Sequence, residues 1–319
     1  MDQAESLRKR VASSEPAQKS AIAKSPIIPA PLSQNPLVPP AKMTPGSSRL
    51  RVIAVTSGKG GVGKTNLTAN LAVLAARAGK RVLIIDADLG LANVEIVFGL
   101  KPKHHIGSLI EGTHTMDEVL IEGPLGLKIL SAGSGIQSLT QLDQTQKLRL
   151  SAALDGIEDK FDLVLVDSGA GIGDNVLFFV GAAQEALLVV SPEPTSLVDA
   201  YAVVKVLSQQ AGITTFNVVI NPVVDELQAR EIFPKLTAVT SRFLSAKVRH
   251  LGYIPRDENL HRAIMVQRPV VEAFPLSPAS RALSIISDKL LATPAPARVE
   301  SGFKFMWQRL LREASPTAL

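Results

Sequence analysis

Short apolar runs alternate with longer stretches of helical periodicity between residues 51 and 291. Several runs are apolar at consecutive positions, which is typical of strands buried on both faces of a parallel sheet. Strands are predicted at residues 51–55, 81–86, 127–130, 163–167, 186–190, 216–221 and 248–254. Helical patterns lie between them, notably at 66–78, 142–157, 196–210 and 279–291. Repeated βαβ units of this kind predict a three-layer α/β domain with a mostly parallel sheet.

Both ends of the chain depart from this pattern. Residues 1–50 are rich in proline and show no apolar periodicity, so they cannot bury enough surface to offset the entropy of ordering them. A second break, Thr-Pro-Ala-Pro-Ala, begins at Thr293. We expect a flexible Pro-rich tail at 1–50, one globular domain at 51–293, and a linker with a terminal helix at 294–319.

Composition excludes several classes of protein. Hydrophobic residues make up 46% of the chain and charged residues 20%, which is enough apolar material for a large core. No apolar run reaches the length of a membrane span, and the basic start is not followed by the apolar stretch of a signal peptide, so we expect a cytoplasmic protein. The absence of cysteine excludes disulfides, thiolate zinc sites and clusters held by the chain's own thiolates. The net charge of +5 is compatible with anionic lipid, nucleic acid or an acidic partner and selects none of them.

The first predicted strand leads into a glycine-rich string, Ser-Gly-Lys-Gly-Gly-Val-Gly-Lys-Thr at residues 57–65. Its spacing is that of a phosphate-binding loop, whose glycines let backbone N–H groups converge on phosphate oxygens at the positive end of the following helix. In such loops the lysine, here Lys64, reaches the terminal phosphates of a nucleotide and the next hydroxyl binds Mg²⁺. The predicted cofactor-binding residues are Gly58, Gly60, Gly61, Val62, Gly63, Lys64, Thr65 and Asn66.

Two other predicted strands end in carboxylates. Asp86 ends the strand at 81–86, with Asp88 two residues later, and Asp167 ends the strand at 163–167. The carboxyl ends of parallel strands meet at one edge of a sheet, where ligands bind and where carboxylates can serve Mg²⁺ and an attacking water. Either aspartate alone could form a turn or cap a helix, but a phosphate loop in the same chain favours a metal site. The glycines that follow Asp167 suit a switch loop.

Lys59 is a second lysine near the start of the loop, and the string Lys-Gly-Gly-Val-Gly-Lys-Thr resembles the deviant phosphate loop of the MinD/ParA family. The resemblance implies ATP and Mg²⁺ as cofactors and an ATP-dependent sandwich dimer, in which Lys59 contacts the nucleotide of the other subunit. The catalytic residues that it implies are Lys59, Lys64 and Asp88, the last positioning the hydrolytic water. The metal residues that it implies are Thr65, Asp86 and Asp167.

Two residues at the ends of later predicted strands are candidates for binding adenine. Asn221 and Pro255 match positions where the family holds adenine, but an asparagine at a strand end is as often a simple turn residue. Three longer strings, at 86–95, 167–173 and 192–201, are similar to the FlhG (FleN) group of this family. That group comprises MinD-type ATPases that control the number and placement of bacterial flagella, and the resemblance covers about residues 51–291.

The first residues also resemble that group. They match the Asp-Gln-Ala-x-x-Leu-Arg segment with which such proteins stimulate an FlhF-type GTPase of the signal-recognition class. From the residues alone the segment is a short amphipathic turn that would order only on binding, and an incidental terminus is the alternative. The partner-binding residues implied by the resemblance are Asp2, Gln3, Ala4, Leu7 and Arg8.

The last residues have helical periodicity from 302 to 312. Cations lie opposite an apolar face, as in helices that insert into anionic headgroups, and the pattern resembles the membrane-targeting helix of MinD and FlhG. A helix that docks on the protein's own core or on a dimer partner remains the alternative. The predicted membrane-binding residues are Phe303, Met306, Trp307, Leu310 and Leu311.

Together these features predict an ATP-hydrolysing homodimeric switch. It would cycle between the cytoplasm and the inner face of the cytoplasmic membrane, because a single weak helix binds firmly only when ATP joins two copies. The predicted role is control of flagellar number and placement through an FlhF-type GTPase. A basal-body ring protein or a flagellar transcription regulator is a further candidate partner, and no specific nucleic acid is expected. The alternatives are a MinD-like division-site or ParA-like partition ATPase, and a nucleotide-dependent scaffold that does not hydrolyse ATP.

Overall fold

The computed structural model of the chain describes residues 50–89, 92–133, 142–243 and 246–294. The chain divides into two units, residues 1–46 and 47–319, and the described residues all belong to the second. The predicted partner-binding segment at 2–8 and the predicted membrane helix at 302–312 lie outside the described residues.

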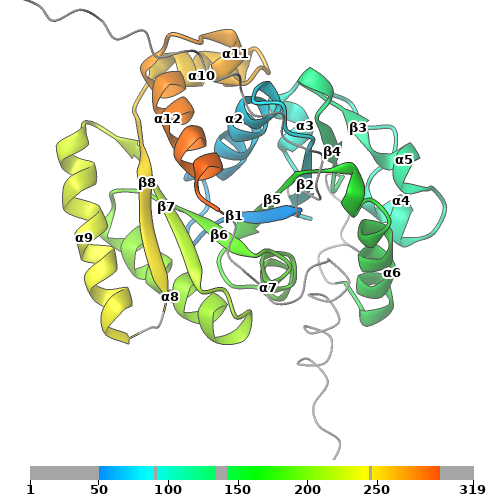
Figure 1. Cartoon of the computed structure of the whole chain (residues 1–319), viewed down its shortest axis with the longest axis horizontal. Helices are drawn as coiled ribbons and strands as arrows, with labels where there is room; N and C mark the ends of the chain where they lie inside the picture. Colours follow the sequence, from blue (N-terminus) through cyan, green and yellow to red (C-terminus); the bar gives the residue numbers. More distant parts are fainter. Residues whose placement is uncertain (1–49, 90–91, 134–141, 244–245, 295–319) are drawn as a thin grey trace, which may run out of the picture. The chain divides into compact units, whose positions relative to one another are not determined.

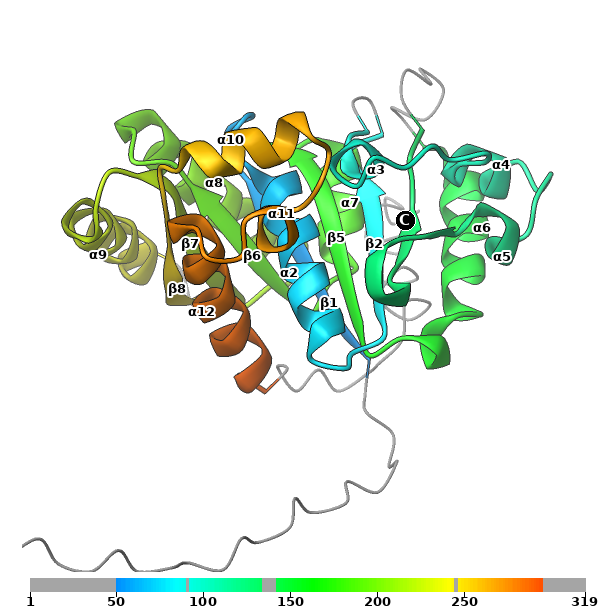
Figure 2. The ribbon, with the colours of Figure 1, turned by 90° about the horizontal axis from the view of Figure 1, so that it is seen from above.

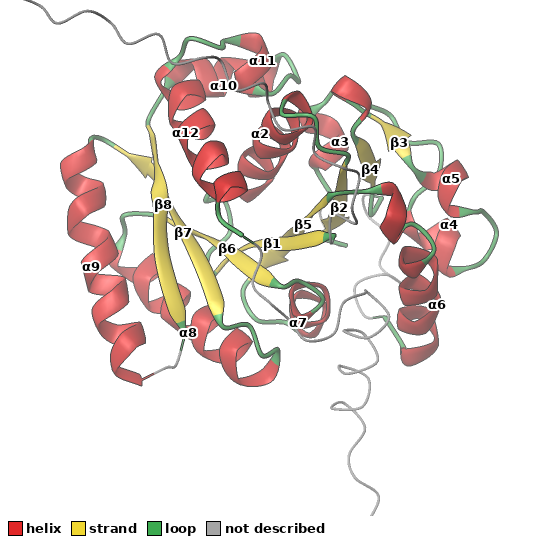
Figure 3. Cartoon of the chain, viewed as in Figure 1, coloured by secondary structure: helices red, strands yellow, loops and turns green. Residues whose placement is uncertain are grey.

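An eight-stranded sheet with the order β3-β4-β2-β5-β1-β6-β7-β8 forms the middle layer (Figures 1 and 3). Only β3 and β4 pair in antiparallel fashion, and the other pairings between described strands are parallel. The strands are β1 (Arg51–Ser57), β2 (Val82–Ala87), β3 (Ile121–Glu122), β4 (Lys128–Leu130), β5 (Leu163–Ala170), β6 (Glu185–Val190), β7 (Thr215–Val223) and β8 (Lys247–Pro255).

Helices cover both faces of the sheet, because successive residues of each central strand point into two different apolar layers. In β1, Val52 and Ala54 face one layer, while Ile53 and Val55 face the other. The first layer is covered by α4 (Ile106–Ile110), α5 (Met116–Val119), α6 (Gln144–Asp155), α7 (Asp174–Gly181), α8 (Pro194–Gln210) and α9 (Glu226–Phe243). The second, seen in front of the strands in Figure 2, is covered by α2 (Lys64–Arg77), α3 (Val94–Val97), α10 (Glu258–Met265), α11 (Val270–Ala273) and α12 (Pro278–Ala292). Short 3-10 helices lie at η1 (Pro124–Gly126) and η3 (Glu158–Lys160).

The predicted three-layer α/β fold is confirmed, and every strand and helix predicted within residues 51–291 is present with ends shifted by a few residues. The sequence did not predict strand β3 or helices α3 to α5, α7 and α9 to α11. Most of these are too short to show a period. Helix α7 is almost wholly apolar, and α9 contains Pro234, a residue that normally ends a helix. Within the described part of the chain, no helix is long and apolar enough to cross a membrane.

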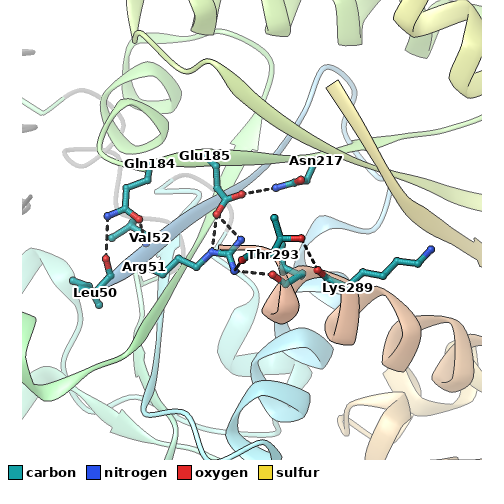
Figure 4. A network of polar contacts seen from close by, with 9 residues as sticks. Leu50, Arg51, Val52, Gln184, Glu185, Asn217, Lys289 and Thr293 are labelled. Atoms are coloured by element: carbon teal, nitrogen blue, oxygen red, sulfur yellow. Dashed lines mark hydrogen bonds and ion pairs between the residues drawn. The ribbon is translucent and has the colours of Figure 1, made fainter. Parts of the chain in front are cut away.

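A buried ion pair joins the amino ends of three strands to the end of α12 (Figure 4). The Arg51 guanidinium contacts Oε1 of the fully buried Glu185 at 2.7 Å, and Asn217 Nδ2 donates to the other Glu185 oxygen at 2.6 Å. Arg51 Nη1 also donates to the carbonyl oxygens of Leu290 and Thr293, at 2.7 and 2.9 Å. The guanidinium therefore neutralises a buried carboxylate and caps the carboxyl-terminal end of α12.

Replacing Arg51 by methionine should leave the Glu185 carboxylate buried without a counter-charge. We expect the free energy of unfolding to fall by about 3–5 kcal/mol, measured by urea denaturation. Arg81→Met is the matched control, because Arg81 is itself 55% exposed where it pairs with Asp162 and should cost less than about 1 kcal/mol. Equal losses in the two variants would show that the buried pair stabilises the fold no more than a surface pair does.

Candidate functional site

The phosphate loop occupies residues 58–63, between the carboxyl end of β1 and the start of α2. Gly61 and Gly63 have φ values of +74° and +91°, which residues with a side chain rarely adopt. Gly63 is the N-cap of α2 and no side chain caps the helix, so its first-turn N–H groups remain available to an anion. The loop therefore has the geometry of a phosphate site.

Neighbouring elements hold this loop closely. A Cβ at Gly58 would lie 2.4 Å from Cβ of Asp199 in α8, so only glycine fits there. Asn221 Nδ2, at the carboxyl end of β7, donates to the Val62 carbonyl at 2.7 Å. The Lys59 ammonium forms an ion pair with Glu193, the N-cap residue of α8. In this structure Lys59 is thus engaged by an acid of its own chain.

Lys64 is buried beneath the loop. Its Nζ donates to Ser57 Oγ at 3.0 Å, and Ser57 Oγ in turn donates to the Lys59 carbonyl at 2.6 Å. Burial lowers the pKa of Lys64, and the nearby carboxylates of Asp167 and Asp88 partly oppose this shift. A desolvated ammonium in this position interacts strongly with a phosphate, because water does not screen the charge.

Asp86 and Asp167 are register partners on the adjacent strands β2 and β5, and both are buried. Burial, with a smaller contribution from the Asp167 charge, raises the pKa of Asp86 well above its ordinary value. Burial also raises the pKa of Asp167 to about 6, although hydrogen bonds from Thr65 and Thr68 and the Lys64 charge act in the opposite direction. Two like charges side by side in a dry site oppose ionisation, so the pair favours a bound cation.

Asp86 also organises the segment that follows it. Its Oδ1 accepts the Asp88 N–H at 3.1 Å, and its Oδ2 accepts the N–H groups of Asn93 and Val94 at 3.0 and 3.1 Å. Asp88 itself is only partly buried and lies beside Gly169, where an added Cβ would be 3.7 Å from the Asp88 carboxyl. The loop after β2 and the predicted switch loop after Asp167 therefore meet at Asp88.

The adenine candidates lie on the other side of the phosphate loop. Asn221 is buried, and its Oδ1 has no hydrogen-bond partner within the described residues. Pro255 ends the edge strand β8, is the register partner of Val223, and lines a groove beside α12. Asn221 thus contacts the phosphate loop directly, whereas Pro255 is placed at the same edge of the sheet but one strand further out.

These residues fit a magnesium nucleotide. The Thr65 hydroxyl and two carboxylates supply hard oxygen donors, the type that Mg²⁺ prefers, and the loop supplies N–H groups and Lys64 for phosphates. No cluster of three or more His, Cys, Asp or Glu side chains in the described ranges could hold a metal ion. Magnesium in phosphate-loop sites is shared with phosphate oxygens and water, so this donor set is the appropriate one.

Sequence reasoning missed four residues of the site. Glu193 and Asp199 lie in the string 192–201, whose similarity to the FlhG (FleN) group gives no role to either residue. Their contacts with the loop depend on how α8 packs. Thr68 donates to Asp167 Oδ1 at 3.1 Å, and its position one turn after Lys64 on the same helix face could have revealed it. Ser57 directly precedes the glycine-rich loop, and its position in the sequence could have revealed it in the same way.

Asn66, a predicted cofactor residue, lies in the first turn of α2 and its carbonyl accepts from Asn70 Nδ2.

Comparison with known proteins shows the family of the chain. Residues 53–270 match the CobQ/CobB/MinD/ParA nucleotide binding domain. The antiactivator FleN of Pseudomonas aeruginosa is 46% identical over 263 residues, which cover 82% of this chain and 94% of FleN. The flagellum site-determining protein YlxH of Helicobacter pylori is 30% identical over 266 residues, 82% of this chain and 90% of YlxH. MinD of Pyrococcus horikoshii, solved in complex with Mg-ADP, has 26% identity and a TM-score of 0.63, over 76% of this chain and 96% of MinD.

The fold and the phosphate loop define a P-loop nucleotide-binding protein built on a mostly parallel sheet. The chain belongs to the MinD/ParA family of ATPases, in the FlhG (FleN) group.

Gly58→Ala should destabilise the nucleotide-free protein, because the new methyl group would meet Cβ and the carbonyl carbon of Asp199 at 2.4 and 2.5 Å. We expect a loss of about 1–3 kcal/mol in the free energy of unfolding, measured by urea denaturation. Gly60→Ala is the matched control, because nothing lies within 4 Å of its added Cβ, and it should change stability by less than about 0.5 kcal/mol. A Gly58→Ala protein as stable as this control would contradict a tight contact between the loop and α8.

The raised pKa of Asp167 predicts how the free energy of unfolding depends on pH. Since the folded chain binds this proton more tightly than the unfolded chain, Asp167 should lower the stability of the nucleotide-free protein as pH rises from about 4 through 6. Asp167→Asn should therefore be more stable than the wild type at pH 7.5, by on the order of 2–3 kcal/mol, with the difference vanishing toward pH 4. Unfolding curves of both proteins between pH 4 and 8, without nucleotide or Mg²⁺, measure this. A difference independent of pH would refute the assignment.

Proposed function

We propose that this protein is a Mg²⁺-dependent ATPase that dimerises on ATP and regulates the number and placement of flagella. The observation that carries the ATPase assignment is the buried Lys64 beneath a glycine loop, with the paired carboxyls of Asp86 and Asp167 on the adjoining strands. The similarity to FleN and to the flagellum site-determining protein YlxH supports the flagellar role.

The site residues would have different roles, depending on where they lie. The N–H groups of residues 58–66 and the Lys64 ammonium would bind the phosphates, and Thr65, Asp86 and Asp167 would hold Mg²⁺ directly or through water. When bound, Mg²⁺ neutralises the charge that develops on the phosphate oxygens. Asp88, partly exposed where the loops after β2 and β5 meet, would orient the attacking water. Pro255 and Asn221, whose buried side-chain oxygen has no partner among the described residues, are the candidates for binding adenine.

Dimerisation would take place at the edge of the sheet that carries the site. Large apolar side chains are exposed in the loops and helix starts at this edge, including Ile172 at 46%, Val198 at 68%, Val224 at 70% and Leu227 at 65%. Such clusters are typical of surfaces that become buried in an assembly. Lys59 would exchange its exposed, weakly held partner Glu193 for the nucleotide of the second subunit.

The two ends of the chain would bind the partners. We assign residues 1–50 as a tail whose first residues stimulate an FlhF-type GTPase, 51–293 as the ATPase domain, and 294–319 as a linker with a helix that binds the anionic inner surface of the cytoplasmic membrane. The sequence patterns at 2–8 and 302–312 support these assignments. The protein would move between the cytoplasm and the membrane, because one short helix binds weakly and the ATP-bound dimer presents two. A basal-body ring protein or a flagellar transcription regulator is a further proposed partner.

ATP turnover by purified Asp88→Ala protein tests the catalytic assignment. We expect hydrolysis to be lost while ATP-dependent dimers persist in size-exclusion chromatography, because Asp88 would act on the water and not on the phosphates. Lys64→Ala is the control, since it should lose nucleotide binding and dimers together. A wild type that binds ATP but never hydrolyses it, even with an FlhF-type GTPase added, would instead favour the non-hydrolysing scaffold.

A chain ending at Ala297 tests the membrane assignment. It should hydrolyse ATP at the basal rate but fail to sediment with anionic liposomes that retain the full chain in ATP and Mg²⁺. Equal sedimentation of the two proteins would show that the terminal helix is not the membrane anchor. In cells, an Asp88→Ala allele that alters division or plasmid retention but not flagellar number would favour a MinD-like or ParA-like role.

A further inference from the structure

The edge strand β8 and the helix α12 beside it carry a row of basic side chains that the nucleotide site does not use. Lys247 and Arg249 are exposed on β8, and Arg281 and Lys289 are exposed on α12. Between the two α12 residues, at helical spacing on the same face, Ile285 is 55% exposed. We call these five residues the cationic edge. The α12 members line a groove of about 670 Å³ between α9, β8 and α12.

Little within the described structure neutralises this charge. Lys247, Arg249 and Arg281 take part in none of the ion pairs formed by the described residues. Lys289 Nζ donates to the uncharged Leu251 carbonyl at 3.0 Å.

Acidic residues lie near the basic row, but the ion pairs among the described residues include none between these acids and the row. Two of them, Asp225 and Glu226, line the groove beyond the carboxyl end of β7, and Glu226 is paired with Arg230 at 2.6 Å. The exposed Asp288 directly precedes Lys289 on α12 and lies about two turns after Arg281 on the same helix face. The four cations of the cationic edge outnumber these three acids, one of which is paired with Arg230, so the surface is net positive and includes an exposed isoleucine.

The chain leaves the domain beside this surface. Arg51 holds the Thr293 carbonyl, and the Thr293 hydroxyl donates to the Lys289 carbonyl at 2.8 Å, so the exit point lies one turn from the cationic edge. The connector 294–302 can span at most about 30 Å. A segment 303–311 bound to a membrane would thus keep the end of α12 near the headgroups.

We propose that the cationic edge is a second membrane-contact surface that binds anionic lipid headgroups together with the C-terminal segment. The proposal rests on the membrane association proposed above and adds a site in the folded domain. Cations around an exposed isoleucine are the combination that favours an anionic interface, where headgroups meet the charges and acyl chains meet the apolar group. Each such cation adds about fivefold to binding at low salt, so this surface would supplement one short helix.

The test is vesicle co-sedimentation of the full chain in ATP and Mg²⁺, with Lys247 and Arg249 both changed to glutamine. On phosphatidylglycerol-containing vesicles we expect binding at least tenfold weaker than wild type at 50 mM salt. The difference should largely disappear at 0.5 M salt, because salt screens exposed charges. Basal ATP turnover without vesicles should stay unchanged. The matched control is Lys101→Gln with Lys103→Gln, two exposed lysines that follow α3, toward the edge of the sheet opposite β8.

The outcomes separate this proposal from the one on which it rests. If the wild type binds, the chain ending at Ala297 does not, and the β8 variant binds like wild type, the cationic edge is not a membrane surface while the membrane-cycling function stands. If the wild type itself does not bind, both proposals are wrong. If the β8 variant loses retention of duplex DNA but keeps vesicle binding, the edge is a nucleic-acid surface and the proposal is overturned.

Discussion

The structure depends on one electrostatic constraint, the burial of two carboxyl groups and one ammonium at the same edge of the sheet. Asp86 and Asp167 are adjacent because β2 and β5 pair in parallel register, and Lys64 enters from the start of α2. Burial raises the pKa of both acids and lowers that of the lysine, because it disfavours the charged form of each group. Such a cluster is costly in the free protein and becomes favourable when a magnesium nucleotide supplies the missing charges. The two apolar layers of the sheet hold the backbone in place, which allows the site to remain formed in spite of this cost.

Helix α8 gives the site its second support. It touches the phosphate loop at Gly58 through Asp199 and at Lys59 through Glu193. The first contact leaves no space, so the loop and the start of α8 must move together. The second is a solvent-exposed ion pair of small energy, which another anion can replace. The Gly58–Asp199 contact is thus rigid and the neighbouring Lys59–Glu193 ion pair is exchangeable. Lys59 can therefore change its partner while the loop itself stays in place.

The opposite end of the sheet has a different role. There Arg51, Glu185 and Asn217 join the first residues of β1, β6 and β7, and the same guanidinium holds the last carbonyls of α12. A buried ion pair of this kind often adds less to stability than an apolar contact of the same size, but it requires one arrangement of its partners. It therefore fixes the direction in which the chain leaves α12, beside the cationic edge.

The sequence by itself determined the layers of the fold and the centre of the site. Buried parallel strands read as continuous apolar runs, and a phosphate loop needs glycines and a lysine at fixed local spacing, so both appear in the order of residues. Short elements such as α3 carry too few residues to show a period, and the sequence could not place them. Tertiary structure alone decided which acid engages Lys59, why Gly58 admits no side chain, and that Arg51 pairs with Glu185. These contacts join residues more than a hundred positions apart, and they exist only because the strand order brings distant segments together, which no local pattern encodes.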